Sequence, residues 1–563
     1  MLNENQKLAV EHYMGPCLTI APPGSGKTKC LVERVANLIK EHHVLPDNIL
    51  VLTFTKDAAC EMKDRFCREY FSYEKMPFFG TFHSLFYNIL KEDAGLSGAK
   101  ILSQNQSVFL LKEAMKACHI QENNLNPLEL IKEFSRCINQ NVSFETIHQN
   151  MSYINPEKLY QEYSRQKEKN MCFDFDDLMV RTKELFCNHP KIKDKWRKRF
   201  SFILLDEMQD INQLQFDIVK MLLDDNKNIF AVGDDDQSIY EFRGSRPDIM
   251  LSFNEQFPNV KIIYLKTNYR SLRQIVSMSA HLIHNNKNRY DKEIQSFSEG
   301  YGMVSFYNFC DETEQSLYIL SKIKETPKEK NIGILFRNKS DGLFLSKILE
   351  MHKIFYFSKD EFVNHMDEKI TKDLLSYLKA GKSGADDEIK RTLYGKPKGD
   401  LNVISHLSFY ASINYIRKGI GYDRYLYETY GHDMALHEQA LLVCDFVQES
   451  IKALPKDFQM EDIETFFKNS TMKSAYRVGN KEDSNVYLYT FHGAKGLEFD
   501  EVFCININEG IVPSPLNPGG LEEERRMFYV AVTRAKSKLS VCCIKNRGGK
   551  TYHPSRFIDE LKN

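Results

Sequence analysis

Short runs of apolar residues recur along the chain and alternate with segments whose apolar residues follow helical spacing. In the N-terminal half the apolar runs cover residues 17–21, 49–54, 202–205, 228–232 and 261–265. Between the first two runs, Leu31, Val35, Leu38 and Ile39 lie on one face of a predicted helix. Continuous apolar runs are typical of strands that are buried on both faces, so this order predicts a parallel β-sheet with connecting helices.

The same pattern returns in the C-terminal half, which predicts a second α/β unit. Its candidate strands cover residues 303–309, 331–336, 354–357, 486–491, 501–505 and 538–544. Two stretches, at about residues 85–173 and 381–480, show helical spacing or loops without convincing strands. The sequence therefore predicts an α/β fold with two parallel sheets, each interrupted by a mostly helical insertion.

The composition narrows the class of protein. The 563 residues suggest about three to five structural units, and 76 basic against 77 acidic side chains leave a net charge of −1. A polyanion would therefore be bound in a local groove, because there is no global basic field. The 13 cysteines form no CxxC pair, which disfavours a structural zinc site or a disulfide framework. Without a secretory signal or a long apolar run, we expect a cytoplasmic protein with no membrane partner.

One octapeptide has the composition of a phosphate-binding loop. It follows the first predicted strand, opens the first predicted helix and reads Ala21-Pro22-Pro23-Gly24-Ser25-Gly26-Lys27-Thr28. Glycines let backbone N–H groups point at phosphate oxygens, and the helix N-terminus adds positive potential. Lys27 can neutralise phosphate charge, and the Thr28 hydroxyl can ligate Mg²⁺. The strand–helix context favours a nucleotide site over a simple glycine-rich turn.

Acidic and amide side chains follow two further predicted strands. Asp206 and Glu207 come directly after the strand at 202–205, where one carboxylate can hold Mg²⁺ and the other can orient an attacking water. Alone, such a pair is more often a helix cap, but here a phosphate loop precedes it. Gln237 follows the strand at 228–232, as a sensor of the γ-phosphate would, and aromatic residues able to stack on bases come soon after it.

Motifs in a fixed order give the chain a family resemblance. From the N-terminus they are Leu2-Asn3 with Gln6, the phosphate loop, Thr53-Phe54-Thr55, Gly80-Thr81-Phe82-His83-Ser84, Asp174-Phe175-Asp176-Asp177-Leu178, Asp206-Glu207-Met208-Gln209-Asp210, Gly233 to Gly244, Asn268-Tyr269-Arg270-Ser271, Thr490 to Phe499, Glu522 to Arg526 and Thr533-Arg534-Ala535. Nearly from end to end the chain resembles superfamily 1A DNA helicases of the UvrD/Rep/PcrA type. The resemblance implies an ATP-dependent DNA helicase or translocase that moves 3′ to 5′ on single-stranded DNA and acts at junctions with duplex DNA.

The same resemblance implies an arrangement of domains. Two RecA-like parallel-sheet domains would hold ATP at their interface. Domain 1A would cover residues 1–84 and 174–268, and domain 2A residues 269–380 and 481–563. A helical insertion, 1B, would cover residues 85–173, and a shortened insertion, 2B, residues 381–480.

For the nucleotide, the resemblance implies ATP and Mg²⁺ as cofactors and a role for single residues. Gln6 would read adenine, Tyr269 would stack on it, and residues 21–28 would hold the phosphates. Thr28 and Asp206 would be Mg²⁺ ligands, and Glu207 would be the catalytic base. The remaining implied contacts are Gln237 as the γ-phosphate sensor, Arg270 and Arg534 as arginine fingers from the second α/β unit, and Glu498 as a further nucleotide contact from that unit.

For the polynucleotide, the resemblance implies a groove along both α/β units. Its residues would be Phe54, His83, Tyr240, Phe242, Arg243, Thr490 and His492. Stacking of aromatic rings on bases is sequence-tolerant, as a translocating enzyme requires. Phe54 ends an apolar strand, so packing in the core is an equally good explanation for that ring.

Two departures from the family pattern bear on function. Lys56-Asp57 stands where Asn-Lys is usual, which adds an acid near the expected DNA backbone, and Lys29 stands where an arginine often flanks adenine. Together with the short second insertion, they keep an alternative open: a partner-dependent motor ATPase of a nuclease or anti-phage complex, with little unwinding alone. A protein partner or self-association is therefore conceivable. A silent nucleic-acid-binding scaffold is disfavoured because the expected catalytic residues are all present.

Overall fold

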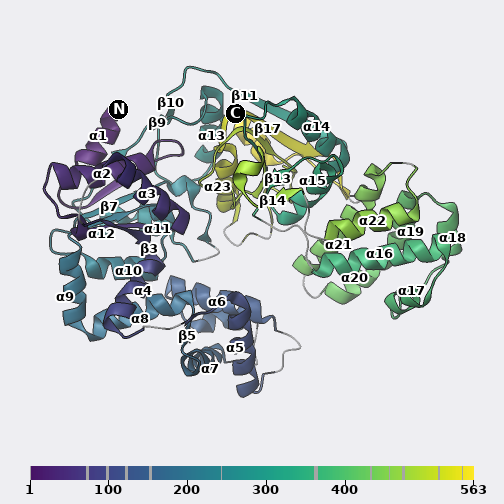
Figure 1. Cartoon of the computed structure of the whole chain (residues 1–563), viewed down its shortest axis with the longest axis horizontal. Helices are drawn as coiled ribbons and strands as arrows, with labels where there is room; N and C mark the ends of the chain where they lie inside the picture. The colour runs from purple at the N-terminus through teal and green to yellow at the C-terminus, as the bar shows by residue number, and fades with distance from the viewer. Residues whose placement is uncertain are drawn as a thin grey trace. The chain divides into compact units, whose positions relative to one another are not determined.

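The chain divides into two compact units, each built on a parallel β-sheet (Figure 1). The computed structural model describes residues 2–70, 75–96, 100–120, 125–150, 155–241, 244–359, 365–431, 434–455, 457–471, 476–515, 517, 520–547 and 550–562. Unit 1 comprises Met1–Arg270 and Asn286–Phe297, and unit 2 comprises Ser271–Asn285 and Ser298–Asn563. The predicted α/β fold with two RecA-like parallel sheets is confirmed.

The sheet of unit 1 has six strands in the order β3-β2-β6-β7-β1-β8, and every neighbouring pair is parallel. The strands are β1 (Cys17–Ile20), β2 (Ile49–Thr53), β3 (Phe78–Thr81), β6 (Phe202–Leu205), β7 (Ile229–Gly233) and β8 (Lys261–Tyr264). Five of them match predicted apolar runs. The sixth, β3, is the edge strand that the sequence pattern did not predict.

Helices cover both faces of this sheet because alternate residues of each strand point to opposite sides. Leu18 and Leu50 pack into one core with helices α4 (Phe82–Asp93), α8 (Phe175–Asn188) and α10 (Gln213–Leu222). Cys17 and Val51 pack into the other core with α2 (Lys27–Lys40) and α3 (Lys56–Glu69). The remaining helices of this part are α1 (Glu4–Glu11), α9 (Pro190–Arg199), α11 (Pro247–Leu251) and α12 (Phe253–Gln256).

A helical insertion in unit 1 has a hydrophobic core of its own. Its helices are α5 (Gln104–Ala117), α6 (Pro127–Gln140) and α7 (Pro156–Lys169), with a short parallel pair of β4 (Lys100–Ile101) and β5 (Cys172–Phe173). The buried residues of this core run from Leu102 to Tyr163. Helix α4, which the expected boundary at residue 85 would divide, packs instead against the sheet, because Leu85 and Phe86 belong to the sheet's core.

The sheet of unit 2 has seven strands in the order β11-β17-β16-β12-β15-β13-β14, again all parallel. They are β11 (Met303–Phe309), β12 (Ile332–Phe336), β13 (Tyr356–Phe357), β14 (Arg477–Val478), β15 (Val486–Thr490), β16 (Phe499–Cys504) and β17 (Ala535–Ile544). The other elements of this part are α13 (Arg273–His284), α14 (Glu312–Glu325), α15 (Lys339–Met351), α23 (Gly520–Val532), α24 (Arg556–Lys562) and the hairpin of β18 (Asn546–Arg547) and β19 (Lys550–Thr551).

The second insertion is helical, as its spacing predicts. It consists of α16 (His365–Ser383), α17 (Asp387–Thr392), α18 (Asn402–His406), α19 (Phe409–Lys418), α20 (Tyr422–Tyr430), α21 (Met434–Ala453) and α22 (Met460–Thr471). One cluster of buried residues continues from strand β12 into α16 and α21. In the part of the chain that the structure describes, no helix is long and apolar enough to cross a membrane.

The chain passes between the two units three times, after residues 270, 285 and 297. Residues 269–270 and 286–297 were expected in the second RecA-like domain, but they belong to unit 1. The return segment is held there partly by a parallel pairing of β10 (Gln295–Ser296) with β9 (Thr267–Asn268). Helix α13, which lies between the first two crossings, belongs to unit 2.

Candidate functional site

The carboxyl edge of the unit 1 sheet carries most of the residues that the sequence singled out. The phosphate loop follows β1, Asp206 and Glu207 follow β6, and Gln237 follows β7. The neighbouring strands β2 and β3 lead into Phe54 and His83. Because all these strands are parallel, their carboxyl ends lie at one edge, which is where open α/β sheets bind ligands.

The backbone of the phosphate loop has the conformation that its glycines permit. Gly24 and Gly26 have φ angles of 70° and 84°, and α2 begins directly afterwards at Lys27. A Cβ on Gly26 would lie 2.8 Å from the Gln6 side-chain nitrogen. The Ser25 hydroxyl is buried and has no hydrogen-bond partner among the described residues. A close-packed loop with an unpaired buried hydroxyl at a helix N-terminus fits a phosphate group.

Two residues from the N-terminus lie beside this loop. The buried Gln6 side chain donates to the Ser25 carbonyl oxygen at 2.9 Å, which explains how α1 is fixed against the loop. Asn3 caps α1 and donates to the Tyr269 hydroxyl at 2.8 Å. The Tyr269 N–H donates to the Gly24 carbonyl oxygen at 2.8 Å. The expected adenine contacts, Gln6 and Tyr269, are therefore both joined to the phosphate loop.

Glu207 occupies a strained backbone position at the end of β6. Its φ is 52°, in the left-handed region that only a small minority of non-glycine residues adopt. Its carboxylate accepts a hydrogen bond from Lys27 Nζ at 2.9 Å and another from the Gln209 amide. The loop lysine and the expected catalytic base are thus in direct contact.

Asp206 lies buried beside Glu207 and accepts a hydrogen bond from Thr53 Oγ1 at 3.1 Å. Burial and the charge of Glu207 raise the pKa of Asp206, while Lys27 opposes the shift. Within the described ranges no group of three or more His, Cys, Asp or Glu side chains could hold a metal ion. A cation on Asp206 and Thr28 would therefore complete its shell with phosphate and water oxygens, the arrangement typical of Mg²⁺.

Gln237 is buried and fixed by its own turn. Its amide nitrogen donates to Asp234 Oδ2 at 2.7 Å, and the Asp234 N–H donates to Gln209 Oε1 at 2.9 Å. Because Gln209 also donates to Glu207, one hydrogen-bonded path joins Lys27, Glu207, Gln209, Asp234 and Gln237.

Arg270 lies against the phosphate loop within unit 1. A Cβ added to Gly24 would lie 2.6 Å from Arg270 Cβ. The Arg270 N–H donates to Asn268 Oδ1 at 2.8 Å, which fixes the backbone where β9 ends. This expected arginine finger therefore belongs to the same unit as the loop, and not to the second unit as we expected.

Three of the side chains expected to contact DNA take part in ring pairs: Phe54 with Tyr240, and His83 with Phe175, which was not among the expected contacts. Phe54 and Tyr240 stack with ring centroids 5.3 Å apart and planes inclined by 17°, and both are partly exposed. His83 meets the edge of Phe175 at 5.1 Å, and burial lowers the pKa of His83 to about 4. Phe242 and Arg243 lie outside the described residues. Since Phe54 is only partly buried and pairs with a partly exposed ring, core packing alone does not account for its position.

The expected site residues of unit 2 lie near the ends of β15, β16 and α23. The Arg534 guanidinium is buried and donates to the Val530 and Leu497 carbonyl oxygens at 2.8 and 3.3 Å. Glu498 is exposed and pairs with Lys536 at 2.9 Å. Thr490 ends β15 and accepts from the Gly493 N–H at 3.1 Å, and the partly exposed His492 lies in the turn that follows.

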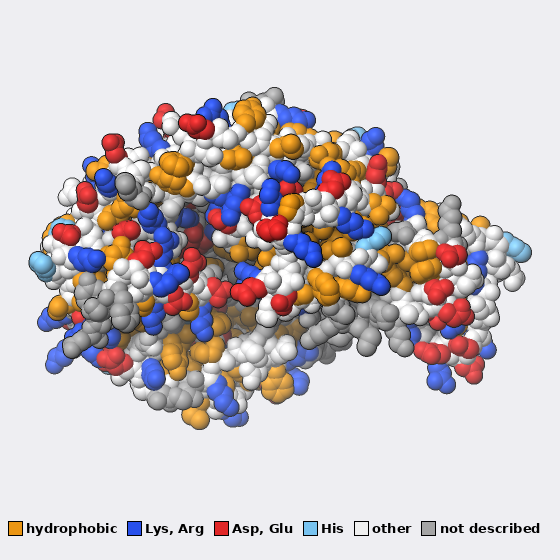
Figure 2. Space-filling model, turned by 45° about the horizontal axis from the view of Figure 1, so that its top comes forward, with side chains coloured by type: hydrophobic (Ala, Val, Ile, Leu, Met, Phe, Trp, Pro, Cys, Tyr) orange, Lys and Arg blue, Asp and Glu red, His pale blue; other side chains and the backbone are white. Residues whose placement is uncertain are grey.

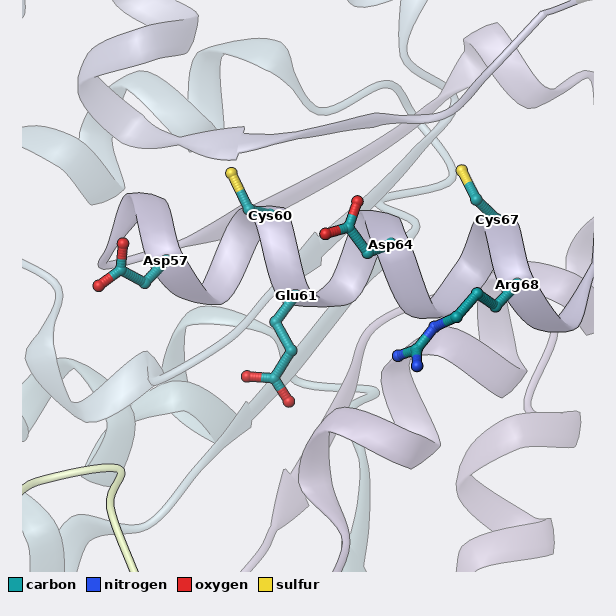
Figure 3. A pocket seen from close by; sticks show the side chains of 6 residues that line it. All are labelled: Asp57, Cys60, Glu61, Asp64, Cys67 and Arg68. Carbon is teal, nitrogen blue, oxygen red and sulfur yellow. The ribbon is translucent and has the colours of Figure 1, made fainter. Parts of the chain in front are cut away.

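A shallow, open stretch of surface lies along α3, directly after Phe54 and Thr55. All of its lining residues come from this helix (Figure 3), namely Asp57, Cys60, Glu61, Asp64, Cys67 and Arg68. This lining has three carboxylates and one guanidinium, but the same helix also carries Lys56, Lys63 and Arg65. Helix α3 as a whole is balanced in charge, so Asp57 is a local departure.

Three residues of the return segment 286–297 were not predicted to belong to the site. Lys292 and Arg289 bind the aspartates of the turn that carries Gln237. Phe297 is 68% exposed and packs against the Tyr269 ring at 4.9 Å. No motif covers this segment, and an isolated lysine between polar residues is normally a solvated side chain, so the sequence carried no signal for it.

Comparison with known proteins agrees with this geometry. The UvrD/REP helicase N-terminal domain matches residues 2–258, and the UvrD-like helicase C-terminal domain matches residues 263–402 and 427–546. A putative ATP-dependent DNA helicase, YjcD of Bacillus subtilis, is 32% identical over all of this chain and 81% of its own length. The ATP-dependent DNA helicase PcrA of Bacillus subtilis and DNA helicase II of Escherichia coli are each 30% identical over all of this chain, and over 85% and 87% of their own lengths.

Both halves of the chain thus match the helicase domains in order, and the relatives align over its whole length. The phosphate loop, the carboxylate pair and the turn that carries Gln237 meet at one sheet edge, an arrangement suited to nucleotide hydrolysis. The chain belongs to the UvrD/Rep family of ATP-dependent DNA helicases.

Proposed function

We propose that this helicase translocates 3′ to 5′ along single-stranded DNA and opens duplex DNA at junctions with single strands. The observation that carries the proposal is the turn after β7. Gln237 is joined through Asp234 and Gln209 to Glu207, and three residues later Tyr240 stacks on the partly exposed Phe54. One short segment therefore connects groups suited to phosphate with aromatic rings suited to bases. The direction of movement is taken from the family resemblance.

In this proposal the residues of unit 1 bind and orient the nucleotide. Residues 21–26 and Lys27 hold the phosphates, Gln6 and Tyr269 hold the base, and Thr28 and Asp206 hold Mg²⁺. Bound MgATP supplies the phosphoryl group and the cation that offsets its charge. Glu207 orients the attacking water, and Gln237 and Arg270 contact the γ-phosphate. Arg534 and Glu498 of unit 2 contribute further nucleotide contacts, and Thr490 and His492 contact DNA together with His83, Phe242 and Arg243.

The direct test combines ATP hydrolysis with unwinding. We expect single-stranded DNA to stimulate hydrolysis, and a duplex with a 3′ tail to be unwound faster than a duplex with a 5′ tail. Glu207→Gln serves as the inactive control in both assays. Equal hydrolysis with and without DNA, or a preference for the 5′ tail, would contradict the proposal.

A second candidate is a partner-dependent motor ATPase of a nuclease or anti-phage complex. Asp57 favours it, because this exposed acid lies close after Phe54, where β2 ends, and would repel a DNA backbone passing there. In this case the monomer hydrolyses ATP in response to single-stranded DNA but unwinds little. Single-turnover unwinding at rising protein concentration separates the two candidates, because a motor that needs a partner or self-association gains activity only when that partner is present.

A further inference from the structure

A buried lysine lies among three consecutive aspartates in unit 1. Lys292 is 5% exposed, and its Nζ lies 2.6 Å from Asp234 Oδ1, 2.6 Å from Asp235 Oδ1 and 2.7 Å from Asp236 Oδ2. Arg289, from the same segment, donates to both carboxylate oxygens of Asp236 at 2.9 and 2.8 Å. The turn that carries Gln237 is therefore bound by two cations of the return segment 286–297.

Backbone contacts complete this cluster. The Tyr290 N–H donates to Asp235 Oδ2 at 2.8 Å, and the Gln237 N–H donates to the Asp234 carbonyl oxygen at 2.9 Å. Burial raises the pKa of Asp235 to about 6, and Lys292 opposes that shift. The positive charge of Lys292 thus favours the ionised form of this carboxylate.

Stability alone is a poor explanation for such a cluster. Removing charges from water costs several kcal/mol per ion, so a buried ion pair often contributes no more than apolar packing would. The cluster holds three acids against two bases, which leaves it with a formal charge of −1 in the interior. Groups of this kind are more readily explained where they fix a particular arrangement of side chains.

The arrangement that Lys292 fixes is centred on Asp234. One oxygen of Asp234 binds Lys292, and the other accepts the Gln237 amide at 2.7 Å. The Asp234 N–H holds Gln209, which in turn donates to Glu207. Lys292 is thus one hydrogen bond from the residue that orients Gln237, and it touches neither Glu207 nor the phosphate loop in any contact described.

We propose that Lys292 is a positioning residue for ATP hydrolysis, fixing Asp234 so that the Gln237 amide and, through Gln209, the Glu207 carboxylate are held in one arrangement. Arg289 supports the same turn by holding Asp236. The inference rests on the proposed roles of Glu207 and Gln237. It predicts that loss of Lys292 affects the chemical step more than nucleotide binding, because the described path from Lys292 passes through Asp234, Gln209 and Glu207 before it reaches Lys27 of the phosphate loop.

The test compares two buried lysines in the same unit. Lys167 is 2% exposed and binds Asp174 and Asp177, each at 2.7 Å, between α7 and α8. Lys292→Gln and Lys167→Gln remove the same charge from similar surroundings, so both should lower the melting temperature. Only Lys292→Gln should lower kcat, by about tenfold to a hundredfold as expected for misplaced catalytic groups, with the Kd for ATP changed less than about threefold.

Two further variants keep the proposal open to refutation. Lys292→Arg restores the charge and should recover part of kcat. If Lys292→Gln does not fold, the double variant Lys292→Gln with Asp235→Asn removes one charge of each sign, and the loss of kcat should persist in it. Wild-type kcat in the folded Lys292 variants, or a raised KM with unchanged kcat, would overturn the proposal.

The same assays distinguish a failure of the positioning role of Lys292 from a failure of the proposed function. If the wild-type chain hydrolyses ATP and Glu207→Gln abolishes this, but Lys292→Gln does not reduce it, only the positioning role is wrong. If Glu207→Gln retains turnover, the role of Glu207 itself is wrong.

Discussion

Glu207 shows how a single residue combines strain with chemistry. Its left-handed backbone, which costs a non-glycine residue about 1–2 kcal/mol, places the carboxylate between Lys27 and Gln209. Asn141, which caps the end of α6, has the same backbone conformation, so it is the contacts of the Glu207 carboxylate that set this residue apart.

Glu207→Gln should keep ATP binding and lose hydrolysis. The amide has the shape of the carboxylate but cannot accept a proton from the attacking water, a change that typically lowers rates by about 10²–10⁴-fold. Equilibrium binding of a fluorescent ATP analogue and steady-state hydrolysis are the two measurements. Turnover within about threefold of the wild type would show that another group is the base.

His83 should make the fold sensitive to acid. Burial lowers the pKa of His83 from 6.5 to about 4. Between these two pH values the His83 imidazole is mostly protonated in the unfolded chain and mostly neutral in the folded chain. The stabilisation is complete above pH 6.5 and declines as the pH falls toward 4. At pH 5 the loss is about 1–2 kcal/mol.

Thermal unfolding of His83→Asn between pH 7 and pH 5 tests this expectation. The variant should lose less stability on acidification than the wild type. His12, whose pKa burial, Arg34 and Lys261 lower to about 4, acts in the same direction and remains in both proteins. Parallel pH profiles for the two proteins would mean that His83 is protonated in the folded state.

The stacked pair of Phe54 and Tyr240 should couple hydrolysis to movement. Stacking on bases contributes about 1–3 kcal/mol per base, so Tyr240→Ala and Phe54→Ala should weaken binding of single-stranded DNA. Hydrolysis without DNA should change little, because neither ring contacts Glu207 or Lys27 in the described contacts. The measured quantity is base pairs unwound per ATP. Wild-type coupling in both variants would mean that these rings only pack against each other.

At the scale of elements, the phosphate loop depends on its contact with the end of β9. A Cβ on Gly24 would lie 2.6 Å from Arg270 Cβ and 2.8 Å from Asn268 Oδ1. The phosphate loop is therefore in close contact with the segment that carries Tyr269 and Arg270. A larger side chain at Gly24 would push the two apart.

Gly24→Ala should weaken ATP binding and lower stability together. Gly95→Ala is a matched control, because Gly95 has a φ of 67° and nothing lies within 4 Å of its added Cβ. Both variants carry the backbone strain of about 1 kcal/mol, and only Gly24→Ala adds a clash. We expect at least tenfold weaker ATP binding for Gly24→Ala, or about 1.4 kcal/mol. Equal effects of the two substitutions would contradict this.

Much of the element order follows from the sequence because strands buried on both faces appear as continuous apolar runs. The edge strand β3 escapes this pattern, since Phe78-Phe79-Gly80-Thr81 is short, contains glycine and is only partly buried. The phosphate loop and carboxylate pair can also be predicted from the sequence, because their chemistry requires particular residues in consecutive positions. The role of Lys292 cannot be predicted in this way, because its partners lie 56 to 58 residues away and only folding brings them together.

At the scale of the whole molecule, the net charge is −1. Basic and acidic side chains are interspersed over the face shown in Figure 2. Without a net positive charge, we expect DNA binding to rely on a limited number of phosphate contacts in a local groove.

Unwinding by the monomer should accordingly be weak and sensitive to salt. Each contact with a DNA phosphate releases counterions, so the affinity for DNA falls as the salt concentration rises. A chain with few such contacts binds DNA weakly from the start, so added salt soon prevents binding. We expect DNA-stimulated hydrolysis to persist at a salt concentration where unwinding by the monomer is lost, and a dimer or partner to restore unwinding. Robust, salt-insensitive unwinding by a demonstrated monomer would contradict this expectation. It would show that the short second insertion does not weaken unwinding.

The triple passage of the chain between the units has a consequence for biosynthesis. Domains of a growing chain generally fold as they emerge, the N-terminal one first. Here the aspartates of the Gln237 turn leave the ribosome well before Lys292 does, because 58 residues separate Asp234 from Lys292. Helix α13 of unit 2 is made in that interval. Unit 1 thus acquires Lys292 only after α13 of unit 2 has been made, and its own sequence is complete before the first strand of the unit 2 sheet, β11, is synthesised.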